Sequence, residues 1–116
     1  MLRIETSIPQ KISTNKYYRL HWRKQHKVNE IYFKYFPVII KEQQIKSVKN
    51  FPVEITYLFT FKGKVLDSLN LTAMAKLIED SLVQNDILPD DSPKYVSMST
   101  LIPKKGNEDK VEILII

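Results

Sequence analysis

The stretch FPVEITYLFTFKG, residues 51–63, has the clearest periodicity in the chain and decides its fold class. Apolar or aromatic side chains stand at every second position: Val53, Ile55, Tyr57, Phe59 and Phe61. Because successive side chains of a strand point to opposite faces, this alternation predicts a β-strand with one buried face. β-branched and aromatic residues, which favour a pleated and half-buried surface, dominate the stretch, and Gly63 ends it.

Shorter apolar runs predict three more strands. Residues 2–8 alternate until Pro9 ends them, residues 95–102 alternate again, and residues 110–116 are apolar enough for a well-buried strand. Between the last two, PKKGNED (103–109) predicts a turn.

Two segments have helical periodicity. In residues 21–36 one apolar face comprises Val28, Ile31, Tyr32 and Tyr35, and a neighbouring basic face comprises Arg23, Lys24, Lys27 and Lys34. We expect Pro37 to end or kink this helix, with a further helical turn or two in residues 38–49. Residues 71–86 are predicted to form the second helix, whose apolar stripe is Leu71, Met74, Ala75, Ile78 and Leu82. Residues 10–20 and 87–94 read as loops.

The predicted order is therefore β-α-β-α-β-β. This order favours a two-layer α+β domain, in which two helices cover a mixed or antiparallel sheet of about four strands. A chain of 116 residues is long enough for one hydrophobic core, so we expect a single domain over residues 1–116.

Charge is distributed unevenly along the chain. Residues 1–63 hold twelve Lys and Arg against four acids, a net +8, whereas residues 64–116 have a net −3. The asymmetry indicates a basic surface for a polyanion such as nucleic acid, together with a localised acidic site. A solvated lysine-rich surface explains the same numbers.

Composition excludes several classes of function. The absence of cysteine excludes disulfides, thiolate nucleophiles and cysteine-bound metals, and two glycines cannot build a phosphate-binding glycine-rich loop, so we expect no nucleotide cofactor. No apolar run reaches the roughly 18 residues of a membrane span, and the first residues do not resemble a signal peptide. We expect a cytoplasmic protein without a membrane partner.

Acidic residues flank the second helix. Asp67 and Asn70 precede it, Asp90 and Asp91 follow it, and Lys76 lies on it. Carboxylate oxygens suit Mg²⁺, which can activate water and polarise a phosphodiester, while a lysine neutralises charge on the phosphate. The other interpretation is structural: Asp67 and Asp91 serve turns and caps, Asn70 caps the helix, and Lys76 pairs with Asp80 at i,i+4.

The segment VLDSLNLTAMAKLIEDSLVQNDILPDDSPKYV (65–96) resembles the core of the RusA-type Holliday junction resolvases found on phages and prophages. That family has an Asp-x-Asp-Asn signature, a lysine on the next helix, an aspartate one turn later and an Asp-Asp pair before a strand. The matching residues here are Asp67, Asn70, Lys76, Asp80, Asp90 and Asp91. The stretch STNKYYRLHWRKQHK (13–27) also resembles the family's N-terminal segment.

The resemblance implies a homodimeric, Mg²⁺-dependent endonuclease, with Mn²⁺ as a substitute metal, that cuts four-way DNA junctions by paired nicks in a bacterium or a phage-infected host. Its catalytic residues would be Asp67, Asn70, Lys76 and Asp91, and its metal ligands Asp67 and Asp91 with help from Asp80 and Asp90. Its DNA contacts would be Lys16, Arg19, His21, Arg23, Lys24 and Lys27.

One position departs from the signature. The second aspartate falls at Leu69, which cannot bind Mg²⁺, and the spacing from Asn70 to Lys76 is about one helical turn longer. Either Asp90, Asp80 or Asn70 replaces the lost ligand, or the protein is a non-catalytic DNA-binding relative. A small adaptor without any nucleic-acid role is a third hypothesis.

The aromatic residues of the N-terminal segment allow two interpretations. Tyr17, Tyr18 and Trp22 are interleaved with basic residues and could stack on unpaired bases at a junction centre. Alternatively, they pack the first long helix on the sheet.

Overall fold

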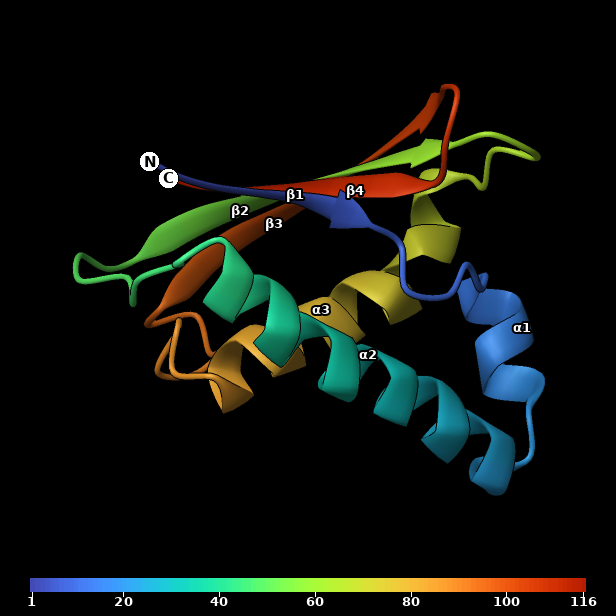
Figure 1. Ribbon diagram of the computed structural model, residues 1–116, viewed down its shortest axis with the longest axis horizontal. Coiled ribbons are helices and arrows are strands. Elements are labelled where there is room, and N and C mark those ends of the chain that lie inside the picture. Colours follow the sequence, from blue (N-terminus) through green and yellow to red (C-terminus); the bar gives the residue numbers. More distant parts are fainter.

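In the computed structural model, which describes residues 1–116, the helices cover one face of a single four-stranded sheet (Figure 1). The strands are β1 (Leu2–Ser7), β2 (Val53–Phe61), β3 (Val96–Lys105) and β4 (Lys110–Ile115). The helices are α1 (Thr14–Arg19), α2 (Trp22–Glu42), the 3-10 turn η1 (Ser68–Leu71) and α3 (Thr72–Gln84). None of these helices combines the length and apolar character needed to span a bilayer.

The strand order across the sheet is β1-β4-β2-β3. β2 is antiparallel to β4 and parallel to β3, and β4 is antiparallel to β1, so the sheet is mixed. The chain crosses from β2 to β3 through α3, and Figure 1 shows α2 and α3 side by side beneath the sheet. The predicted two-layer α+β fold is confirmed.

One core lies between the sheet and the two long helices. The alternating side chains of β2 that the sequence predicts as buried are all buried, with Phe59 and Phe61 completely so. The predicted apolar stripe of α3 is buried as well, with Leu71 and Ile78 fully removed from solvent. Burial of each such side chain is worth about 1.5–3 kcal/mol, so this contact between β2 and α3 is a main source of stability.

The segment predicted as a loop over residues 10–20 contains the short helix α1. Ser13 caps it, because the Ser13 hydroxyl accepts a hydrogen bond from the Lys16 backbone N–H at 3.1 Å. Six residues are too few to display a helical period, and only Tyr17 is buried. A cap residue was therefore the one local signal for this helix.

Helix α2 does not end at Pro37 but continues to Glu42, which confirms the further helical turn predicted after the proline. Proline removes only one backbone donor, and the flanking Phe36 and Ile39 are buried in the core, which holds the helix together. Ile31, predicted on the apolar face, is 43% exposed. The buried face instead comprises Val28, Tyr32, Phe36 and Ile39.

β3 runs to Lys105, so the predicted turn over residues 103–109 begins later than expected. Pro103 lies inside the strand, opposite Phe59 of β2. Because β3 pairs with β2 alone and forms an edge of the sheet, its open side needs no N–H donor at this position.

Candidate active site

Lys76 lies near the start of α3 and joins two carboxylates. Its Nζ is 3.0 Å from Asp80 Oδ1, one helical turn further on, and it donates a hydrogen bond to Asp91 Oδ2. Asp91 comes from the segment between α3 and β3, so this segment returns along the helix. The structure thus brings together Lys76, Asp80 and Asp91.

The charges of this group support one another. The hydrogen bond that Lys76 donates to Asp91, and then the one that it donates to Asp80, raise the pKa of Lys76 above its ordinary value. The same hydrogen bond from Lys76 lowers the pKa of Asp91. At neutral pH the site therefore presents the charged ammonium of Lys76 beside the ionised carboxylate of Asp91.

Glu79, which the sequence analysis missed, belongs to the same group. The hydroxyl of Tyr57, on β2, donates a hydrogen bond to Glu79 Oε1 at 2.7 Å. Partial burial raises the pKa of Glu79, and burial together with the charge of Glu79 raises the pKa of Tyr57. The available signal was position: Glu79 stands four residues after the buried Ala75, at the edge of the apolar stripe.

We name these five residues the Lys76 cluster: Tyr57, Lys76, Glu79, Asp80 and Asp91. A shallow pocket beside it opens between α3 and β3, where Tyr57, Lys76 and Glu79 share the lining with Ser99. A reacting group could therefore reach the ammonium and the Glu79 carboxylate from solvent.

Asp67 and Asn70 are occupied by the turn before α3. The Asp67 carboxylate accepts hydrogen bonds from the backbone N–H of Asn70 at 3.1 Å and from its Nδ2 at 3.0 Å, which caps η1. Asn70 Oδ1 in turn accepts from the backbone N–H of Asn15. Leu69, in place of the signature aspartate, is 80% exposed.

The prediction that Asn70 caps the second helix is wrong, because the 3-10 turn separates it from α3. Leu71 holds the cap position of α3 and makes no side-chain cap bond. The hydroxyl of Thr14, on α1, accepts from the backbone N–H of Ala73 at 2.9 Å instead. A residue 59 positions away thus supplies the missing cap, which ties α1 to the helix that carries Lys76.

The four predicted metal ligands are divided between two places. Asp80, Asp90 and Asp91 line one pocket, and Asp67 is not among its lining residues. No group of three or more His, Cys, Asp or Glu side chains is arranged as a metal site. The pair Asp80 and Asp91 nevertheless converges on one cation, the ammonium of Lys76, and Mg²⁺ in phosphoryl-transfer sites uses one or two carboxylates plus water and phosphate oxygens. The donor chemistry of this pair therefore fits Mg²⁺.

Three of the six predicted DNA contacts line one basic groove. The groove lies between residues 10–12, α1 and α2, and its charged residues are Lys11, Lys16, Lys24 and Lys27. Lys11 was missed because it lies outside the segment that carries the family resemblance. No acid occurs between Glu5 and Glu30, so the groove has no local counter-charge in its own stretch of sequence.

The other three predicted DNA contacts lie at the corner between α1 and α2, outside the groove lining. Arg19 ends α1 and is exposed. His21 caps α2, since its Nδ1 accepts a hydrogen bond from the backbone N–H of Arg23 at 3.2 Å. His21 therefore has a structural role whether or not it contacts DNA.

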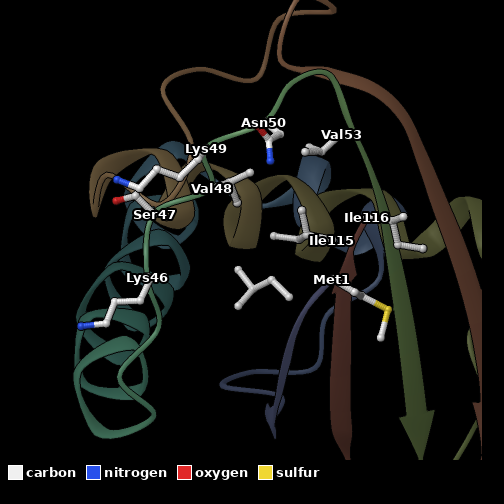
Figure 2. Close-up of a pocket in the computed structure, with 10 residues that line it drawn as sticks. Met1, Lys46, Ser47, Val48, Lys49, Asn50, Val53, Ile115 and Ile116 are labelled. Carbon is white, nitrogen blue, oxygen red and sulfur yellow. The ribbon is translucent and has the colours of Figure 1, made fainter.

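The largest pocket, about 320 Å³, lies elsewhere (Figure 2). The ends of β1 and β4 form it with residues 46–50, and its lining is apolar apart from Lys46, Ser47, Lys49 and Asn50. It contains no carboxylate and no residue of the Lys76 cluster. Comparisons with protein-family models, curated proteins and solved structures found no match for this chain.

Proposed function

We propose that the protein is a metal-dependent, structure-specific endodeoxyribonuclease that resolves four-way (Holliday) DNA junctions in recombination and repair. The observation that carries the proposal is the ammonium of Lys76 held between Asp80 and Asp91. These are the residue types, in the same chain order, on which the resemblance to RusA-type resolvases rests. The basic groove lined by Lys11, Lys16, Lys24 and Lys27, here named the lysine groove, adds a surface that can bind the DNA backbone.

Asp91 and Asp80, with Asp90 beside them, would hold Mg²⁺ or Mn²⁺. The bound metal supplies polarisation of the phosphodiester and a water of lowered pKa. Lys76, kept charged by its carboxylates, stabilises negative charge that develops on the phosphate. The family resemblance makes Asp67 a metal ligand, but its carboxylate accepts two hydrogen bonds from Asn70. The two residues therefore contribute to the site by fixing the turn that precedes α3.

The substrate and assembly follow from the same proposal. Lys16, Lys24 and Lys27 neutralise backbone phosphates, and the contact carries no base specificity. Paired nicks need two active sites, so the working form is a homodimer on the junction. The site of action is the cytoplasm of a bacterium or of a phage-infected host.

The experiment is incubation of the purified protein with a labelled synthetic four-way junction, in Mg²⁺, in Mn²⁺ and in chelator. We expect symmetric nicks with either metal, none in chelator, and none with Asp91→Asn. Asp86→Asn is the matched control, because it removes an exposed carboxylate of the same segment at a positive φ that asparagine tolerates. Intact junctions in every lane of the wild-type protein would reject the proposal.

A second candidate is a non-catalytic DNA-binding relative. The exposed Leu69 and the engaged Asp67 favour it, because both remove a ligand of the family signature. Thermal denaturation separates the candidates: a nuclease predicts that Mg²⁺ or Mn²⁺ raises Tm and that Asp91→Asn removes the rise. Tight, salt-sensitive junction binding with no metal effect and no cut would favour the binding protein.

A further inference from the structure

Trp22, the chain's single tryptophan, lies outside the hydrophobic core. It is the first residue of α2 and is 66% exposed. The expectation that it packs the helix on the sheet is therefore wrong. Burial of an indole removes roughly 150–250 Å² of side-chain surface from water and stabilises a core strongly. An exposed indole does not provide this stabilisation.

The ring is nonetheless held in place by its neighbours. The guanidinium of Arg23 lies 5.3 Å from the ring centroid, and the imidazole of His21 lies 5.6 Å away at an interplanar angle of 33°. His21 is itself bonded to the backbone N–H of Arg23 as the helix cap. The indole thus lies at a helix start against two side chains, of which His21 is fixed by its cap bond, and this contact reduces the entropy lost when a planar ligand binds.

The surroundings specify the chemistry of such a ligand. Arg19, Arg23 and Lys24 flank the indole in sequence and are exposed, and no acid lies within seven residues of it on either side. A lone exposed aromatic residue is common on proteins, but an aromatic face within a basic segment that holds no acid matches ligands that combine planar rings with phosphates.

We propose that Trp22 is a stacking site for an unpaired nucleobase at the branch point of the DNA, with Arg23 neutralising the adjoining phosphate. The inference rests on the proposed function and adds to it a means of telling branched DNA from duplex. The other two aromatic residues of the segment differ from Trp22. Tyr17 is buried with its hydroxyl bonded to Asn29, and Tyr18 is exposed but has no cation over its ring.

The single tryptophan makes the test direct, because all indole fluorescence reports on Trp22. In chelator, so that nothing is cut, the protein is titrated with a dT oligonucleotide, a four-way junction and a blunt duplex. We expect quenching by the oligonucleotide and the junction and little by the duplex. By anisotropy of labelled DNA, Trp22→Ala should weaken junction binding about tenfold, or about 1.4 kcal/mol, and leave duplex binding unchanged, while Trp22→Phe keeps most of the affinity.

Met98→Ala is the control, since Met98 is a half-exposed apolar residue on the distant edge strand β3 and should change neither binding nor quenching. Unquenched fluorescence at saturating junction, or an equal loss of duplex and junction affinity in Trp22→Ala, overturns the stacking site and leaves the nuclease proposal standing. Failure of the wild-type protein to bind any of the three DNAs overturns both. Circular dichroism of each variant checks that it is folded.

Discussion

Lys76 holds together two acids, beside a third, that would otherwise repel one another. Asp80 and Asp91 are its partners, and Glu79 lies close enough for the charge of Asp91 to raise its pKa. Removing the ammonium would leave the two aspartates unpaired and raise the pKa of Asp91 toward its ordinary value. The lysine thus sets both the charge state and the geometry of the site.

We expect Lys76→Gln to lower the rate of junction cleavage by about 10²–10³-fold, the usual cost of one donor to a developing oxyanion. The cost in stability should stay below about 1 kcal/mol, because the side chains of Lys76 and Asp91 are 55% and 31% exposed. Single-turnover cleavage and thermal denaturation measure the two effects. Lys104→Gln, which removes an exposed lysine from β3, is the matched control. A cleavage rate within threefold, roughly, of wild type would remove Lys76 from the mechanism.

Glu79 and Asp91 should contribute to stability with opposite pH dependence. The pKa of Glu79 is raised by burial, so the folded protein holds this proton more tightly than the unfolded chain does, and stability falls as pH rises through the folded pKa. The pKa of Asp91 is lowered by Lys76, so its contribution is present above the unfolded pKa of about 3.9 and is lost as pH falls through the folded value.

Glu79→Gln keeps an oxygen for the hydroxyl of Tyr57 and removes the buried charge. We expect this substitution to stabilise the protein by roughly 0.5–1 kcal/mol near pH 8 and not at all near pH 4. The gain is small because solvent screens the charge of a partly buried carboxylate. Urea denaturation at the two pH values measures the difference. Asp91→Asn should show the reverse, a loss at pH 8 that disappears at low pH. A Glu79→Gln effect that is the same at both pH values would refute the assignment.

Among the elements, β2 and α3 could be predicted because each repeats its apolar side chains over several periods. α1 could not, since six residues give no period, and the end of α2 could not, since the burial of Phe36 and Ile39 overrides the local effect of Pro37. The candidate site also has a part that the sequence predicts and a part that it does not. Lys76 with Asp80 follows from helical spacing, whereas the approach of Asp91 and the pairing of Tyr57 with Glu79 depend on how the layers pack.

The hydrogen bond between the Thr14 hydroxyl of α1 and the Ala73 backbone N–H of α3 gives a prediction about how these two helices stabilise each other. Thr14 caps a helix that lacks its own side-chain cap, and its hydroxyl also lies 2.8 Å from that of Thr72. We expect Thr14→Ala to cost about 1 kcal/mol, or about 4 °C in Tm. A double-mutant cycle with Thr72→Ala should show coupling. Ser13→Ala, which removes only the cap of the short α1, should cost less, and an equal loss would contradict the role of Thr14.

At the scale of the whole molecule, helix α1 contributes to the basic surface, which is the lysine groove, and packs against α3, which carries the acidic Lys76 cluster. Lys16, on this helix, lines the lysine groove, while Tyr17, its neighbour, has a pKa raised by burial and in part by the charge of Asp80. The charge asymmetry of the sequence predicts a basic and an acidic surface, and α1, which lines the basic groove, packs against α3, which carries the acidic one.

This arrangement predicts how binding responds to salt. Each phosphate contact should contribute about −0.9 to the slope of log K against log[salt], so Lys24→Gln and Lys27→Gln should each make the slope less steep by about 1. Because backbone contacts carry no sequence information, the two variants should weaken binding to every DNA by a similar factor. Lys41→Gln, at the far end of α2, removes the same charge outside the groove and is the matched control. Titrations in chelator at four or five salt concentrations measure the slopes. If Lys41→Gln changes the slope as much as Lys24→Gln does, the affinity comes from net charge and the groove is not the path of the DNA.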